Sequence, residues 1–225
     1  MGGFQDVLDD IDVMARYWMK RKMDFLVEAG DEFSESVNPL CYYLEQPGSE
    51  QITIVNLCFT EWALFDRPLE DGMTPLELFV ARRPVAMPRK SWKRLEQVAQ
   101  THYFSRFAIC EKHPKRGTCL LEDVQDGERY EVFDEHLCAV KGWKDGTIAL
   151  RIARVDGGWL GVGQARLYDR AEPEFTAVDG PGAIHPEERA GLSEALRSSF
   201  YLRLCHDVLG ADGRYTPTMR VREAS

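Results

Sequence analysis

The sequence has no long apolar run. No stretch of its 225 residues approaches the roughly 18 consecutive apolar residues that a membrane-spanning helix needs. Its first residues become acidic within a few positions, at Asp6, Asp9 and Asp10, where a secretory signal would have a basic start and an apolar segment. We therefore expect a cytoplasmic protein without a membrane partner.

Motifs with an assigned chemistry are missing as well. There is no Cys-x-x-Cys, no Gly-x-Ser-x-Gly and no Gly-x-x-x-x-Gly-Lys-Ser/Thr, so the simplest redox, serine-hydrolase and phosphate-loop interpretations are excluded. A zinc site could be imagined from cysteines and histidines, but their spacings match neither a finger nor a ribbon. Those residues are Cys110, His113, Cys119, His136 and Cys138. We expect reduced, buried thiols, no metal, no cofactor and no identifiable catalytic residue.

The composition is that of an ordinary globular protein with an acidic balance. Hydrophobic residues make up 44% of the chain and charged residues 29%, and the formal net charge is −9. An evenly acidic protein would be repelled by phosphate backbones and by anionic lipid. The total charge therefore argues against a role on nucleic acid or on a membrane surface.

The charge is not even, however. Residues 81–116 contain 10 basic and 2 acidic side chains, whereas residues 1–80 contain 5 basic and 16 acidic ones. Salt screens exposed charges beyond about 8 Å, so a local basic surface can act despite the opposite total. Its candidate binding residues are Arg82, Arg83, Arg89, Lys90, Trp92, Lys93, Arg94, Lys115 and Arg116. Two interpretations stay open: contact with nucleic acid or an acidic partner, or docking onto the acidic N-terminal part.

Helical patterns dominate up to residue 103. We expect helices over residues 4–29, 50–66 and 89–103, with Gly30 ending the first. A fourth helix begins at Thr74, which can act as N-cap before Pro75 and Glu77, and it ends before Pro84. The apolar stripe of residues 4–29 faces the core in one interpretation and forms a homo-oligomer contact in the other.

Short alternating segments separated by glycine-containing turns follow. We expect strands over residues 104–111, 118–124, 128–134, 147–155 and 159–168. Five short strands of this kind predict a small SH3-like or OB-like barrel, because closure removes exposed sheet edges.

The remainder, residues 170–225, is expected to hold a linker, one helix starting near Pro186 and ending at Gly210, and a polar tail. The predicted fold class is α+β, with a helical region over 1–103, a barrel over 104–169, and these C-terminal elements.

A resemblance rests on two strings and on scattered positions after them. Residues 61–66 (Glu-Trp-Ala-Leu-Phe-Asp) and 71–79 (Asp-Gly-Met-Thr-Pro-Leu-Glu-Leu-Phe) resemble a stretch of uncharacterised bacterial proteins often found with a SEC-C motif. The similarity extends over roughly residues 55–165 and implies an intracellular bacterial protein with a helical segment and a small β-module. Nothing after Arg170 supplies the cysteine-rich zinc knuckle of that motif, and the family provides no catalytic residues.

We expect a non-enzymatic binding, adaptor or regulatory protein that uses the basic surface. The alternative is an enzyme with a site between the helical region and the barrel, using residues such as His113, His136 and Asp123.

Overall fold

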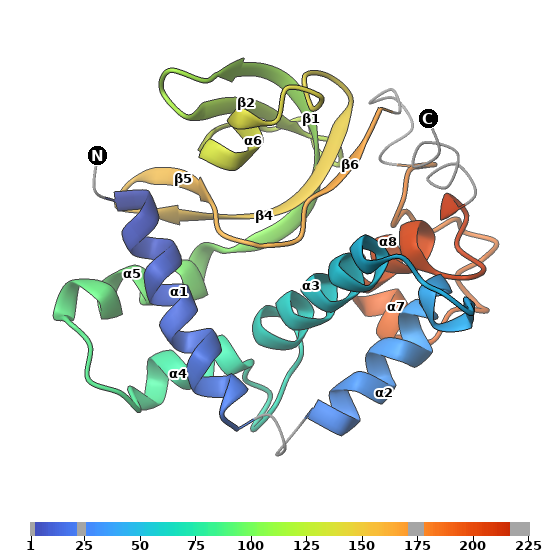
Figure 1. Cartoon of the computed structure of the whole chain (residues 1–225), viewed down its shortest axis with the longest axis horizontal. Coiled ribbons are helices and arrows are strands. Elements are labelled where there is room, and N and C mark those ends of the chain that lie inside the picture. The colour runs from blue at the N-terminus through green and yellow to red at the C-terminus, as the bar shows by residue number, and fades with distance from the viewer. Residues whose placement is uncertain (1–2, 22–25, 171–177, 217–225) are drawn as a thin grey trace.

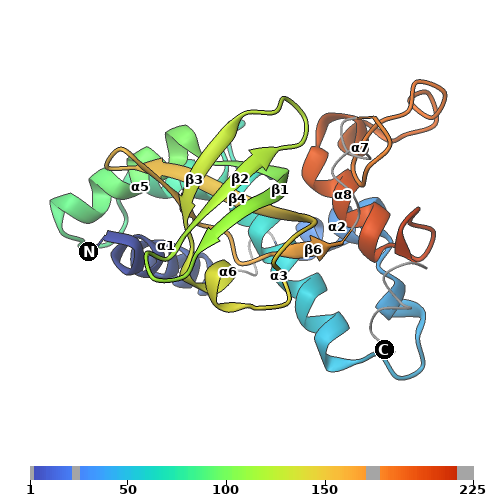
Figure 2. The same ribbon diagram turned by 90° about the horizontal axis from the view of Figure 1, so that it is seen from above.

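The computed structural model describes residues 3–21, 26–170 and 178–216. A β-barrel lies over a layer of helices, with the C-terminal helices at one side (Figure 1). Seen from above, α1 and α5 lie at one side of the barrel and α7 and α8 at the other (Figure 2). Before the barrel come α1 (Gly3–Met19), α2 (Leu26–Val37), η2 (Leu40–Tyr43), α3 (Ser49–Phe65), α4 (Pro75–Arg82) and α5 (Arg89–Thr101).

Three of the predicted helices form as the sequence indicates, and the one expected over 89–103 is α5. The helix expected over 50–66 is α3, and α4 starts at a reciprocal capping pair in which Thr74 accepts from the Glu77 backbone and Glu77 accepts from the Thr74 backbone. After α4, Arg83 adopts a left-handed conformation with φ 46°, so the helix ends before Pro84 as expected.

The prediction of one helix over 4–29 is wrong. The structure has α1, which ends at Met19, and a separate α2 that runs through Gly30. Each helix has its own buried face, with Val7, Met14 and Trp18 on α1 and Phe33 on α2. The α1 stripe packs inside the chain, largely against α5, and so it is not left exposed for a second copy.

The barrel contains β1 (Tyr103–His113), β2 (Thr118–Asp123), β3 (Arg129–Phe133), β4 (Thr147–Val155) and β5 (Gly158–Gly161). Its strand order is β1-β2-β3-β5-β4, and β1 also pairs with β4 and closes the barrel. Beside these antiparallel pairs, β3 and β5 are parallel. A short helix, α6 (Glu135–Ala139), lies between β3 and β4. The parallel pair makes the connectivity OB-like, because an SH3-like barrel has only antiparallel neighbours.

The strand predicted over 159–168 is two strands. β5 ends at Gly161, and β6 (Leu167–Asp169) pairs with β4 outside the barrel. Between them the backbone nitrogens of Gln164 and Ala165 donate to the carboxylate of Glu61 on α3, at 2.8 and 2.9 Å. A side chain from the helical region therefore takes the hydrogen bonds that a continuous strand would have used.

The prediction of a single C-terminal helix from Pro186 is also wrong. The structure has α7 (Glu194–Ser198) and α8 (Phe200–Leu209), each with a serine N-cap, at Ser193 and Ser199. A serine side chain that accepts from a backbone N–H begins a new helix and so separates the two. The predicted end at Gly210 is confirmed, and part of the predicted tail, residues 217–225, lies outside the described residues.

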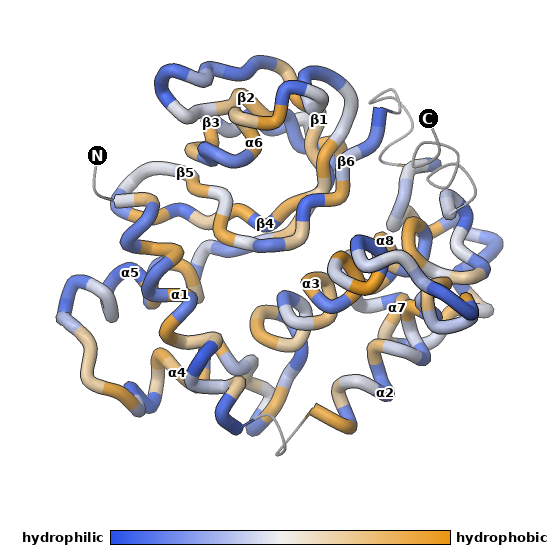
Figure 3. The backbone as a smooth tube through the Cα atoms, viewed as in Figure 1, coloured by the Kyte–Doolittle hydropathy of each residue, from blue (hydrophilic) through white to orange (hydrophobic). Residues whose placement is uncertain are grey.

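Two apolar cores result. One lies inside the barrel, around Phe107, Leu121 and Ile148. The other joins α1–α5 to α8 and to the outer face of β4 at Ala149 and Ala153. Coloured by hydropathy, the helices show hydrophobic and hydrophilic segments in alternation, as expected where only one face of each is buried (Figure 3). The helical region and the C-terminal helices therefore share one core.

Candidate binding pocket of the barrel

A pocket of about 670 Å³, here called the barrel pocket, opens between the β1–β2 turn and the β4–β5 turn. Aromatic and aliphatic side chains from β3 and β5 line it, at Phe133, Trp159 and Leu160. Gly117 in the β1–β2 turn has φ +68°, and a Cβ there would lie 3.0 Å from the Phe133 ring. Glycine is needed at this position for both reasons, since it allows the turn to lie directly against the aromatic wall.

The first turn of α1 reaches the same pocket. Phe4 contacts Phe133 edge-to-face, with ring centroids 5.0 Å apart. The wall of the barrel pocket is thus formed by segments that are far apart in the sequence. Neither Phe4 nor Phe133 was singled out from the sequence as a candidate site residue. The available signal was the alternation along β3, which places the partly exposed Phe133 on the face opposite to the buried Val132.

Charges of both signs surround this apolar wall. Lys115 and Arg116, in the β1–β2 turn, are exposed and form no ion pair within the described residues. Glu131, Glu135 and Asp156 also line the pocket. Because the two cations lie side by side on one turn, they offer a local site for carboxylates at that end of the pocket.

The α5 helix extends this basic character along the surface. Its residue Gln97 bonds to Asp156 of the β4–β5 turn, with Asp156 N donating to Gln97 Oε1 at 2.6 Å. Lys93 and Arg89 precede Gln97 at intervals of four and eight residues, so helical periodicity places all three on one face. Arg89, Lys90 and Lys93 are exposed and lack ion-pair partners in the described part of the chain.

The other four predicted binding residues are paired or buried. Arg82 pairs with Glu70 at 2.6 Å, and Arg83 pairs with Glu96 at 2.5 Å. Trp92 is buried against Phe79, and Arg94 is buried against α1. The basic segment therefore divides: Arg94 docks internally, Arg82 and Arg83 are exposed but paired, and the other five cations are exposed without an ion-pair partner among the described residues.

The residues named for the enzyme alternative are not brought together. Asp123 accepts from Ser105 Oγ at 3.0 Å and from Gln125 N at 2.8 Å, next to the β2–β3 turn. His113 pairs in register with Thr118, at the opposite end of β2. His136 lies on α6 against the ring of Trp143. Since His113 and Asp123 lie at opposite ends of the paired strands β1 and β2, they form no common site.

The cysteines show no metal-binding arrangement. Cys119 and Cys138 lie with their sulfur atoms 3.1 Å apart in the barrel, and Cys110 is exposed. Within the residues that the structure describes, no group of three or more His, Cys, Asp or Glu side chains could hold a metal ion. All six cysteines are free thiols.

A second pocket, of about 460 Å³, lies at the seam between α3, β4 and α8. Arg151 of β4 is 1% exposed there and donates from Nε to Glu61 at 3.0 Å and from Nη1 to Asp66 at 3.1 Å. Burial raises the pKa of Glu61, although Arg151 and the backbone of Ala165 act in the opposite direction. The ion pairs connect the helical region to the barrel.

His102 completes this seam network. Its Nδ1 faces Nη1 of Arg151 at 3.0 Å, and since a guanidinium only donates, Nδ1 must accept and Nε2 carries the proton. Burial and the Arg151 charge lower the pKa of His102 to about 3. A histidine with that pKa is too weak a base for proton transfer near neutral pH.

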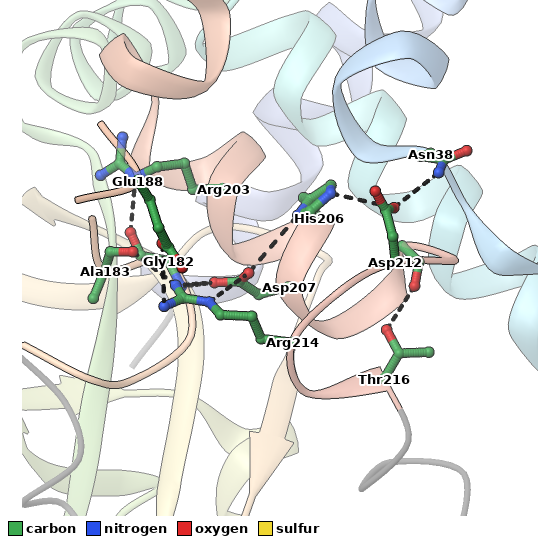
Figure 4. Close-up of polar contacts among 11 residues, drawn as sticks. Asn38, Gly182, Ala183, Glu188, Arg203, His206, Asp207, Asp212, Arg214 and Thr216 are labelled. Atoms are coloured by element: carbon green, nitrogen blue, oxygen red, sulfur yellow. Dashed lines mark hydrogen bonds and ion pairs between the residues drawn. The ribbon is translucent and has the colours of Figure 1, made fainter. Parts of the chain in front are cut away.

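The C-terminal residues are held by a separate polar network, the C-terminal lock (Figure 4). Buried Asp207 of α8 accepts from Gly182 N at 2.7 Å and from Arg214 Nη2 at 2.8 Å. His206 lies between Asp207 and Asp212, and its hydrogen bond with Asp207 is the main cause of its raised pKa. The predicted polar tail is therefore anchored as far as Thr216, whose hydroxyl donates to Gly210 O at 2.6 Å.

Comparisons with known proteins give no relative. No family profile, no curated protein and no solved structure matches the chain.

None of the described helices is long and apolar enough to cross a membrane.

Proposed function

We propose that the protein is a non-enzymatic binding module that takes an extended, acidic segment of a partner protein in the barrel pocket. The observation that supports this proposal most is the apolar wall of Phe133 and Trp159, which lies beside the exposed cations Lys115 and Arg116. Apolar side chains of the partner enter the pocket, and its carboxylates contact the two cations. Peptide recognition commonly combines such an apolar anchor with a charged rim.

The charge of the neighbouring strands favours a protein segment over nucleic acid. Glu111, Leu120 and Glu131 stand opposite one another on β1, β2 and β3, on the outer side of the barrel. In the next row Glu122 pairs with Arg129 at 2.6 Å, which neutralises the arginine. A nucleic acid lying across these strands would bring its phosphates to the carboxylates of Glu111 and Glu131. A peptide within the pocket avoids Glu111, and its own carboxylates contact Lys115 and Arg116 in the β1–β2 turn.

The location agrees with how barrels of this topology are used. OB-like barrels bind oligonucleotides and oligosaccharides on the face of β2 and β3 and on the turns that follow β1 and β4. That is an analogy at the level of the fold, so it supports the place and not the ligand. The class of ligand rests on Lys115, Arg116 and the apolar wall.

The proposal includes an intracellular location, which the free cysteines support because paired cysteines are typical of oxidising compartments. The enzyme alternative would have its site in the seam pocket, between the helical region and the barrel. There, Arg151, Glu61 and Asp66 are engaged with one another, and His102 is a weak base. These bonds favour a structural role for the network.

Selection from a random peptide library displayed on phage tests the proposal. The wild-type protein should enrich peptides with acidic and aromatic or aliphatic residues. Lys115→Glu/Arg116→Glu should lose that enrichment. The matched control Arg89→Glu/Lys90→Glu has the same charge change on exposed α5 residues and should keep it.

A fluorescent single-stranded oligonucleotide provides the opposing measurement. We expect no binding that depends on Lys115 and Arg116. Tight oligonucleotide binding that is lost in the Lys115/Arg116 variant would replace the peptide proposal with nucleic-acid binding. Equal peptide enrichment by both charge-reversal variants would refute the barrel pocket as the site.

A further inference from the structure

Two cysteines of the barrel lie in direct contact. Cys119 of β2 and Cys138 of α6 have their sulfur atoms 3.1 Å apart, closer than the roughly 3.5–4.0 Å of an ordinary non-bonded carbon contact. Both side chains are buried, Cys119 with 0% and Cys138 with 6% of its surface exposed. A disulfide has its sulfur atoms about 2.05 Å apart. A small approach of α6 to β2 would therefore bring the two sulfur atoms to bonding distance.

Only one of these two thiols borders the barrel pocket. Cys138 forms part of the pocket wall, together with Glu135 and Ala139 of the same helix, whereas Cys119 is not among the lining residues. Because Cys138 is only 6% exposed, a small oxidant reaches it more readily than a bulky thiol reagent does. An oxidant that enters the barrel pocket therefore meets Cys138 before Cys119.

The hydrogen bonds of the pair give the two thiols different roles. The Cys138 thiol donates to Thr118 O at 3.4 Å, so the proton between the two sulfur atoms belongs to Cys119. Burial and this bond to Cys138 raise the pKa of the Cys119 thiol. Cys119 therefore keeps its proton and donates it toward the Cys138 sulfur, and Cys138 is the thiol that reacts first.

We propose that Cys119 and Cys138 form a redox modification site, in which a hydroperoxide that enters the barrel pocket converts the two thiols into a reversible disulfide. Disulfides of intracellular proteins are usually transient and redox-sensing, so the site agrees with the free thiols of the reduced protein. The inference uses the barrel pocket as an entry path and does not depend on the peptide proposed as its ligand.

Hydrogen peroxide supplies the oxidising equivalents for both steps. The Cys138 thiolate attacks one peroxide oxygen, so that an S–O bond forms, the O–O bond breaks, and the other oxygen leaves as water with the Cys138 proton. The Cys119 sulfur then attacks the Cys138 sulfur. This forms the S–S bond and breaks the S–O bond, and the hydroxyl group leaves as water with the Cys119 proton. Two thiols are thus oxidised, and one peroxide is reduced to two water molecules.

A second pair of thiols separates proximity from access. Cys58 of α3 and Cys205 of α8 also bond to each other through their side chains, and both are 0% exposed. Since neither member of this pair reaches the surface, hydrogen peroxide should leave both thiols reduced. The chain therefore contains its own control for the effect of the barrel pocket.

The test uses Cys110→Ser, which removes the exposed thiol and leaves five buried ones. The protein is treated with hydrogen peroxide, unfolded, alkylated and weighed by mass spectrometry. Three thiols should be alkylated instead of five, and dithiothreitol should restore all five. Trypsin should release residues 117–129 linked to residues 130–141, because each of these segments contains one cysteine of the pair.

Single substitutions in the same background test the order of the two steps. Cys119→Ala should stop the reaction at the sulfenic acid of Cys138, which dimedone labels, whereas Cys138→Ala should leave Cys119 unlabelled. The matched control Cys58→Ala should keep the cross-link. The cross-link is measured with both cysteines in place, so it decides the proposal even if a core variant fails to fold. Five thiols after peroxide treatment, or thiols lost without a link between Cys119 and Cys138, would overturn it.

Discussion

Arg94 on α5 binds Asp10 on α1, with Nε donating to Oδ2 at 2.7 Å across 84 positions of the chain. The two side chains are only 7% and 9% exposed. Asp6, one helical turn before Asp10, adds a further contact to Arg94 at 3.4 Å. Part of the basic segment is therefore neutralised by the acidic N-terminal helix, inside the fold.

Removing one member of this pair should destabilise the protein strongly. Arg94→Met leaves Asp10 buried without its cation, and such losses cost about 3–5 kcal/mol. Urea unfolding followed by circular dichroism measures the change. Charge reversal at Arg94 would likewise disturb the α1–α5 contact, so Lys93 is the suitable residue for testing the α5 surface.

Two controls accompany that measurement. Arg83→Met breaks the exposed pair with Glu96 and should cost less than about 1 kcal/mol. The double variant Arg94→Met/Asp10→Leu should be more stable than Arg94→Met alone, because no unpaired charge remains. If Arg94→Met lowers the free energy of unfolding no more than Arg83→Met does, the inference that the Arg94–Asp10 pair is buried is wrong.

Stability should fall in mild acid because of His102. Its folded pKa is about 3, whereas an unfolded histidine titrates near the ordinary 6.5. Between these values only the unfolded state binds the proton, so stability is lost as the pH falls below 6.5. From pH 7 to pH 5 this amounts to about 2 kcal/mol. His102→Gln should remove that part of the decrease in the free energy of unfolding.

His206 should act with the opposite sign. Its pKa is raised, so its contribution is complete below the unfolded value of 6.5 and is lost as the pH rises through the folded pKa. His206→Gln should therefore enlarge the loss of stability between pH 7 and pH 5. Identical pH profiles for the two variants would contradict both assignments.

One thiol should react quickly in the native protein. Cys110 is exposed, and the other five cysteines are buried. Burial raises the pKa of Cys110 as well as that of Cys119 and of Cys205, so the difference in reactivity rests on the exposure of Cys110. Ellman's reagent should release about one equivalent rapidly and the rest after unfolding. Cys110→Ser should abolish the rapid phase, and two or more rapid equivalents in the wild-type protein would contradict the burial.

The cap of α4 offers a smaller effect. Thr74→Ala removes the acceptor for Glu77 N, and losing an N-cap costs about 1 kcal/mol. Thr53 on the exposed side of α3 donates to Ser49 O and caps nothing, so Thr53→Ala is the matched control. Measured by thermal unfolding, Thr53→Ala should change the free energy of unfolding by less than about 0.5 kcal/mol. Equal effects of both substitutions would rule out a capping role for Thr74.

Short sequence patterns predicted correctly those helices and strands whose formation depends on neighbouring residues. The Thr74-Pro75 start of α4 and the strand over 147–155 need only neighbouring residues to form. The barrel was predictable as a class because its turns contain glycine at fixed places. Its OB-like topology was not, because the parallel pairing of β3 with β5 depends on residues far apart in the chain.

The same limit applies to the site. Charge density identified Lys115 and Arg116, but it could not separate them from Arg94, whose partner lies on another helix. It also gave no indication of Phe4, which reaches the barrel pocket only because α1 packs beside α5. Sequence spacing indicates which residues share a helix face, and long-range packing decides whether that face meets solvent.

The carboxylate of Glu61 accepts hydrogen bonds from the backbone of Gln164 and Ala165, and so the barrel is unsuitable for expression without the helical region. A gene fragment for residues 103–169 would lose that acceptor, the cover over Ala149 and Ala153, and both acidic partners of Arg151. Its most deeply buried cation would then face solvent alone. Interaction screens with this protein should therefore use the entire chain as bait.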